Sequence, residues 1–297
     1  MTPAATLGLV LCVLAVAGCQ QSPAPDGKPL VVASFFPIYD FARRVAAERA
    51  QVISLVPPGV HGHDWEPSPQ DVAQVRRARL FVYNGAGFEP WADKLIKEAA
   101  GPSTVVVAAS AGLTTTRPGG DGELDPHVWL DPVLAKGEVD AIRAALERGD
   151  PQGKSVYEAN AAAYGAKLSA LDSRFDTGLR DCARRELVVS HAAFGYLTRR
   201  YRLEQIAMTG LAPQAEPSPA ALAAIVRTAR ERKVTAIFLE PLVSPKLAEM
   251  LARELGVRLL TLDPVEGVTK KEAAEGTGYI ELMMRNLESL REGLGCR

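Results

Sequence analysis

Short apolar runs rich in Val, Ile and Leu alternate with helical patterns along most of the chain, and this alternation limits the folds that are possible. The strand-like runs lie at residues 30–35, 51–56, 80–83 and 104–108, and then at 186–190, 203–208, 235–239 and 257–262. Strands separated by helices pair in parallel, and a parallel sheet needs both of its faces covered. We therefore predict an α/β protein in which helices flank parallel sheets.

The two sets of strands are separated by the longest helical pattern in the chain, at residues 153–180. A helix of roughly 28 residues is about 40 Å long, enough to cross one domain and reach the next. The tetrapeptide Glu-Pro-Ser-Pro at 66–69 recurs at 216–219, each time before a predicted helix, which indicates that both halves follow one plan. We predict two similar lobes, at residues 30–150 and 182–297, joined by a spine helix at 151–181.

The first residues predict a cleaved export signal rather than part of the fold. An apolar run too short to span a bilayer ends at Val16-Ala17-Gly18-Cys19, a pattern typical of a bacterial lipobox, although residues 1–18 contain no Lys or Arg. A buried N-terminal helix would leave the abrupt change to polar residues after Cys19 unexplained. We predict a signal peptide at 1–18 and a lipidated tether at 19–29, which places the protein in the periplasm or on the outer face of the cytoplasmic membrane.

Two cysteines, Cys182 and Cys296, remain after the signal and the lipidated Cys19 are set aside. Outside the cytoplasm, thiols are free to oxidise to a disulfide. We therefore interpret this pair as a possible disulfide.

The chain has four histidines, and three of them follow strand-like runs. His63 and His127 lie in loops after strands of the first half, while His191 directly follows the first strand of the second half. Ligands of parallel sheets gather beyond the carboxyl ends of the strands. Two facing lobes would then bring these imidazoles together with Asp263, which ends the last strand. Three imidazoles and one carboxylate form a four-coordinate set suited to zinc.

The acidic residues near this site also have simpler interpretations. Asp263 precedes a proline, as turn-forming aspartates often do. Asp125 and Asp131 precede prolines on either side of His127, and we interpret both as turn formers. Glu66 could be a ligand, an acceptor that orients a ligand, or a backbone cap; we favour the orienting role.

The remaining histidine and the aromatic residues are less informative. His61 either faces solvent or serves as a spare ligand, and His191 could cap the helix that follows it. Trp65, Trp129 and Phe194 flank the three histidines and could wall the cleft, although aromatic residues in this number are usually core.

Three motifs together resemble the metal-binding solute receptors of zinc and manganese ABC importers. They are His63-Asp64-Trp65-Glu66-Pro67-Ser68-Pro69, Asp125-Pro126-His127-Val128-Trp129-Leu130-Asp131-Pro132 and Ser190-His191-Ala192-Ala193-Phe194-Gly195-Tyr196. The resemblance runs from about residue 30 to the C-terminus. It implies two α/β lobes joined by a rigid helix, with one metal held between them by His63, His127, His191 and Asp263. It also implies a lipid-anchored monomeric receptor, not an enzyme, that passes metal to a permease and its ATPase.

Zn²⁺ is favoured over Mn²⁺ as the transported ion, because an imidazole at His191 makes the site rich in nitrogen donors. The loop at 114–123 offers only Asp121 and Glu123, whereas many zinc receptors of this kind carry a His-rich insertion there. The alternatives are a manganese or mixed receptor, a secreted zinc hydrolase and an adhesin. A net charge of −1 provides no basic field for nucleic acid.

Overall fold

The computed structural model describes residues 27–116, 122–211 and 217–297. The predicted signal peptide, Cys19 and most of the tether lie outside the described residues, as do Asp121 and Glu216. Among the helices that are described, none combines the length and the apolar character needed to cross a membrane.

The N-terminal lobe is built on a four-stranded parallel sheet with the strand order β2-β1-β3-β4. Its strands are β1 (Leu30–Ala33), β2 (Gln51–Ser54), β3 (Leu80–Tyr83) and β4 (Val105–Ala108). Successive side chains of β1 point to opposite faces: Val31 packs into the core that contains helices α1 (Phe36–Ala46) and α4 (Pro132–Gly149). Val32 packs instead with α2 (Pro69–Arg77) and α3 (Ala92–Ala99). Both faces are covered, as a parallel sheet requires.

The C-terminal lobe repeats this arrangement, with the strand order β6-β5-β7-β8. Its strands are β5 (Glu186–Val189), β6 (Glu204–Ala207), β7 (Ala236–Leu239) and β8 (Arg258–Thr261). Helices α7 (Pro219–Glu231) and α8 (Lys246–Leu255) cover one face, and α6 (Gly195–Arg200) and α10 (Tyr279–Leu294) cover the other. The predicted α/β class with two similar parallel sheets is confirmed.

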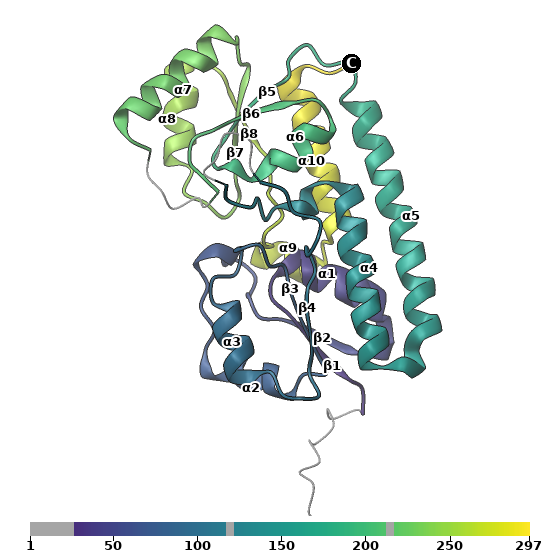
Figure 1. Cartoon of the computed structure of the whole chain (residues 1–297). Coiled ribbons are helices and arrows are strands. Elements are labelled where there is room, and N and C mark those ends of the chain that lie inside the picture. The colour runs from purple at the N-terminus through teal and green to yellow at the C-terminus, as the bar shows by residue number, and fades with distance from the viewer. Residues whose placement is uncertain (1–26, 117–121, 212–216) are drawn as a thin grey trace, which may run out of the picture.

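The long helix α5 (Lys154–Gly178) runs beside both lobes and joins the two halves of the chain (Figure 1). It packs against α1 and α4 of the first lobe and against α10 of the second. Its side chains Tyr157, Leu168 and Phe175 are fully buried in a core that continues into both lobes. A disulfide between Cys182 and Cys296 links the segment after α5 to the segment after α10.

Two helices differ from the sequence prediction. The helix expected at 271–294 is two helices, α9 (Lys270–Glu275) and α10, because Gly276 adopts a left-handed conformation, with φ of 71°, that ends α9. The first helix, expected at 40–49, begins at Phe36, because the proline that follows is tolerated in a first helical turn.

Candidate metal centre

Each of the three predicted histidines lies at a short 3₁₀ turn beyond the carboxyl end of a strand. His63 is in the turn Gly62–Asp64, which follows β2. His127 immediately precedes the turn Val128–Leu130, and His191 immediately precedes Ala192–Phe194, directly after β5. Parallel strands direct these turns to one edge of each sheet, so the two lobes present them to each other.

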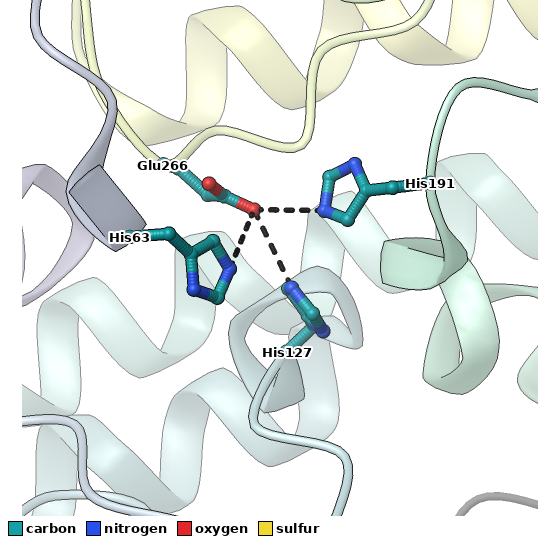
Figure 2. Close-up of side chains that lie close together, drawn as sticks. All are labelled: His63, His127, His191 and Glu266. Atoms are coloured by element: carbon teal, nitrogen blue, oxygen red, sulfur yellow. Dashed lines mark hydrogen bonds and ion pairs between the residues drawn. The ribbon is translucent and has the colours of Figure 1, made fainter. Parts of the chain in front are cut away.

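The structure brings the three imidazoles together around Glu266, which follows β8 (Figure 2). Its Oε1 lies 3.8 Å from His63 Nε2, 3.4 Å from His127 Nε2 and 3.2 Å from His191 Nε2. One ligand atom from each of these four residues lies within 4.8 Å of every other.

The distances from Glu266 Oε1 to the three nitrogens are close to what a tetrahedral zinc ion requires. With zinc–nitrogen and zinc–oxygen distances near 2.0–2.1 Å, neighbouring ligand atoms of a tetrahedron are about 3.3 Å apart. The distances from Glu266 Oε1 to the three nitrogens, 3.2–3.8 Å, bracket this value. His127, His191 and Glu266 are at most 1% exposed, and the side chain of His63 is 10% exposed. The four ligand atoms could therefore hold an ion with little rearrangement and almost no solvent contact.

Two further carboxylates orient the imidazoles. Asp125 Oδ1 lies 2.8 Å from His127 Nδ1 and accepts the backbone N–H of His127 at 3.0 Å. Glu240 Oε1 lies 2.7 Å from His191 Nδ1 and accepts the backbone N–H of His191 at 3.1 Å. A carboxylate at Nδ1 fixes the orientation of the ring and leaves Nε2 available for the metal. The same hydrogen bond raises the basicity of the imidazole as a ligand.

The acidic neighbours make the site hold a proton in its metal-free form. Burial favours neutral His191, but hydrogen bonds with Glu240 and Glu266 outweigh it and raise its pKa to about 10. Burial also favours neutral Glu266, but its hydrogen bonds with the imidazoles hold its pKa well below the usual range. His63 differs, because burial dominates there and lowers its pKa to about 4.

Asp263, the expected fourth ligand, lies outside this group. Its Oδ1 accepts the backbone N–H of Val265 at 2.7 Å, while its own backbone N–H donates to Asn286 Oδ1 at 2.8 Å. Asp263 thus forms a turn, the alternative that its Asp-Pro sequence also suggested, and burial raises its pKa to about 7. The turn passes through Val265 with φ of 58°, a strained conformation for a β-branched residue, and brings Glu266 into the site.

The remaining acidic candidates and His61 lie in different environments. Asp131 does form a turn, because its Oδ1 accepts the N–H of Val133 at the start of α4. Asp125 was expected only to form a turn, but its carboxylate also contacts the imidazole of His127. Glu66 is exposed and lies outside the four-residue group. His61 is buried rather than solvent-facing, and its Nε2 lies 2.9 Å from Glu266 Oε2.

Sequence reasoning overlooked Glu240 and Glu266. The signal for Glu240 was available, because it directly follows the predicted strand at 235–239. Glu266 lies beyond the end of its strand, past an Asp-Pro turn, so strand ends alone did not point to it.

Comparison with known proteins agrees with this geometry. The sequence model of the family described as ZnuA, zinc-uptake complex component A periplasmic, matches residues 31–293. The chain belongs to this family. The family consists of solute-binding receptors rather than enzymes, and these receptors work with an ABC permease and its ATPase.

The sequence is similar to those of zinc-uptake and zinc-binding proteins over nearly its whole length. The high-affinity zinc uptake system protein ZnuA of Bacillus subtilis is 37% identical over an alignment of 306 positions, which covers 96% of this chain and 96% of that protein. The zinc-binding lipoprotein AdcA of Streptococcus pneumoniae is 36% identical over 95% of this chain, but the match spans only 59% of AdcA.

Solved structures share the fold. The Zn(II)-bound ZnuA-like domain of S. pneumoniae AdcA has a TM-score of 0.79 at 38% identity, covering 90% of this chain and 99% of that one. The laminin-binding protein Lmb of Streptococcus agalactiae, described as a bifunctional protein with adhesin and metal transporting activity, has a TM-score of 0.81 at 34% identity. That match covers 90% of this chain and 99% of Lmb.

Proposed function

We propose that this protein captures Zn²⁺ outside the cytoplasmic membrane and delivers it to an ABC permease. The ligands would be Nε2 of His63, His127 and His191 and one oxygen of Glu266. The observation that carries the proposal is the set of four ligand atoms within 4.8 Å of one another, in which Glu266 Oε1 lies 3.2–3.8 Å from the three imidazole nitrogens. The zinc-uptake and zinc-binding relatives support the same ion.

The donor atoms favour zinc over manganese as the cargo. Three of the four are imidazole nitrogens, which suit zinc, whereas manganese is better matched by carboxylate, carbonyl and water oxygens. Zinc also binds almost any such set more tightly than manganese, so an affinity measured in vitro does not by itself identify the ion that is imported.

The number of protein ligands argues against a zinc hydrolase. Catalytic zinc sites have three protein ligands and keep a fourth position for water. Here Glu266 Oε1 lies where it would fill the fourth position, and carboxylates hold the Nδ1 atoms of His127 and His191. Such a closed set suits capture and release rather than activation of water.

A deletion strain of the source organism tests the function directly. We expect it to grow poorly in chelated medium and to recover when zinc, but not manganese, is added. Re-expression of the wild-type gene should restore growth at low zinc, whereas a His127→Ala gene should not. Recovery with manganese alone, or full rescue by the His127→Ala gene, would contradict the proposal.

We also propose that Cys19 is acylated and tethers the receptor to the membrane. The support is the lipobox-like sequence that ends at Cys19 and the zinc-binding lipoprotein among the relatives. Mass spectrometry of the N-terminal peptide from native membranes should show a diacylglyceryl group on Cys19. An unmodified Cys19 within an uncleaved signal would overturn the anchor, though not the zinc site.

A further inference from the structure

A fourth imidazole approaches the opposite side of the Glu266 carboxylate. Glu266 Oε1 faces His63, His127 and His191, while its Oε2 lies 2.9 Å from His61 Nε2. His61 is 8% exposed, and among the described residues neither its nitrogens nor Glu266 Oε2 forms a hydrogen bond, so the two residues meet as a close ion pair of otherwise unpartnered buried atoms. Within the described part of the chain, the close polar neighbour of this buried ring is therefore the second oxygen of the carboxylate ligand.

The short loop that carries His61 is held in place by packing. The rings of His61 and His63 stack with 5.5 Å between centroids and 21° between planes. Between them, Gly62 packs so closely on Phe88 that an added Cβ would lie 2.8 Å from the Phe88 ring. His63 itself contacts Phe88, with 4.4 Å between ring centroids. The sequence His61-Gly62-His63 thus fixes one imidazole at each oxygen of Glu266.

The two oxygens of a carboxylate have different consequences for a bound metal. If both coordinate, the site has five protein ligand atoms, a number that zinc accepts less readily than four in sites without catalysis. Manganese prefers higher coordination and more oxygen ligands. A donor held at the second oxygen would leave only the first oxygen for the ion.

We propose that His61 is a specificity-determining residue that keeps Glu266 monodentate. The Nε2–H of His61 holds Glu266 Oε2, so the site stays four-coordinate and discriminates against manganese. This inference rests on the proposed zinc-receptor function, because it concerns the same site.

The position of His61 argues that it is not itself a ligand. The four residues whose ligand atoms all lie within 4.8 Å of one another do not include it. It lies beside Oε2, whereas the other imidazoles surround Oε1. His61 therefore acts on the metal through Glu266.

The test compares His61→Ala and His61→Gln with the wild-type protein. Glutamine can place an amide N–H near the position of the imidazole N–H, whereas alanine cannot. Glu66→Gln is the matched control, because it changes an exposed residue of the same segment that lies outside the ligand group. Each protein is stripped of metal and titrated with Zn²⁺ and with Mn²⁺, and its Co²⁺ and Zn²⁺ forms are measured by visible absorption and by X-ray absorption.

We expect His61→Ala to lower the preference for zinc over manganese by about tenfold, within the range for residues that orient ligands. The intense visible bands of four-coordinate Co²⁺ should weaken, and X-ray absorption should show one more oxygen at zinc while the three imidazoles remain. His61→Gln should restore the wild-type preference, and Glu66→Gln should not change it.

Two results would overturn the inference. Loss of one imidazole from the zinc shell in His61→Ala would show that His61 is a ligand. Unchanged metal preference and unchanged coordination in a folded His61→Ala protein would show that it has no effect on Glu266. Neither result would touch the proposed function, which is tested separately by the growth of the deletion strain on zinc and on manganese.

Discussion

The negative charge of Glu266 is compensated by the imidazoles that surround it. A buried carboxylate needs a compensating charge close by, and here imidazoles contact both of its oxygens. The raised pKa of His191, about 10, is the result, because that ring is hydrogen-bonded to two carboxylates, Glu240 and Glu266. In the metal-free protein a proton therefore supplies charge that the metal ion supplies on binding.

Zinc binding should release protons and weaken as the pH falls. The raised pKa of His191 means that this ring is charged at neutral pH without metal, whereas coordination requires it to be neutral. Lower pH favours the protonated, metal-free form, so affinity should fall by up to about tenfold per pH unit between pH 8 and 6. His63, whose pKa is lowered to about 4, contributes no proton in this range. Calorimetry in buffers of different ionisation enthalpy measures the release, and a binding heat that is independent of the buffer would contradict it.

The identity of the carboxylate ligand can be decided by two substitutions. Glu266→Ala removes a ligand atom and should weaken zinc binding by more than about 100-fold, beyond the ~10–100-fold loss typical of residues that only orient ligands. Asp263→Asn retains an oxygen that can accept the N–H of Val265, so it should cost less than about tenfold. Competition with a zinc-binding dye measures both affinities. The reverse order of effects would restore Asp263 as the ligand.

At the level of residues, sequence reasoning reached the histidines because their positions follow from the strands. Each lies at or beyond the carboxyl end of an apolar, strand-like run, where parallel sheets place ligands. Glu266 was missed because its place depends on a left-handed backbone at Val265, which a β-branched residue does not signal. The contact between Asp125 and His127 was missed because turn formation already accounted for an Asp-Pro pair.

At the level of elements, the strands were predictable because short apolar runs alternate with helical patterns. The predicted runs at 80–83 and 104–108, for example, correspond to β3, which is mostly buried, and to β4, which is partly buried. The break between α9 and α10 was less accessible, since apolar spacing continues across it. Its cause is local: Gly276 adopts a left-handed conformation that ends α9.

Removing the disulfide should destabilise the fold without changing the metal site. Cys182 and Cys296 are 114 residues apart, and closing a loop of that length contributes about 4–5 kcal/mol in the chain-entropy estimate. The link lies beyond the ends of α5 and α10, and neither cysteine belongs to the ligand group. A Cys182→Ser, Cys296→Ser protein should unfold at lower urea concentration and retain wild-type zinc affinity. An unchanged unfolding midpoint would show that the bridge contributes little.

At the level of the whole molecule, the two lobes share one core. The largest cluster of buried apolar side chains includes residues of α1, α4, α5, β5 and α10, and so passes from one sheet to the other. Polar contacts also cross between the lobes near the site. Trp129 Nε1 donates a hydrogen bond to the carbonyl oxygen of Pro264 at 2.8 Å. The hydroxyl of Tyr279 donates to the carbonyl oxygen of Trp129 at 2.5 Å. This connection differs from a flexible linker between independent domains.

Zinc binding should therefore produce only small movements of the lobes. A wide opening would have to bend α5, which is continuous over its 25 residues, or separate buried side chains of the shared core. Domain closure by a hinge needs a few loop residues that absorb large backbone changes, whereas packed helices permit only small shear movements. X-ray scattering of the metal-free and zinc-bound protein should give nearly equal radii of gyration, with hydrogen exchange changing mainly in the loops around His63 and His127. A radius of gyration that falls by several ångströms on binding would show that α5 bends or that the shared core separates in the metal-free protein. Release to the permease would then depend on lobe opening, whereas a rigid spine leaves it to local movement of the loops that carry the ligands.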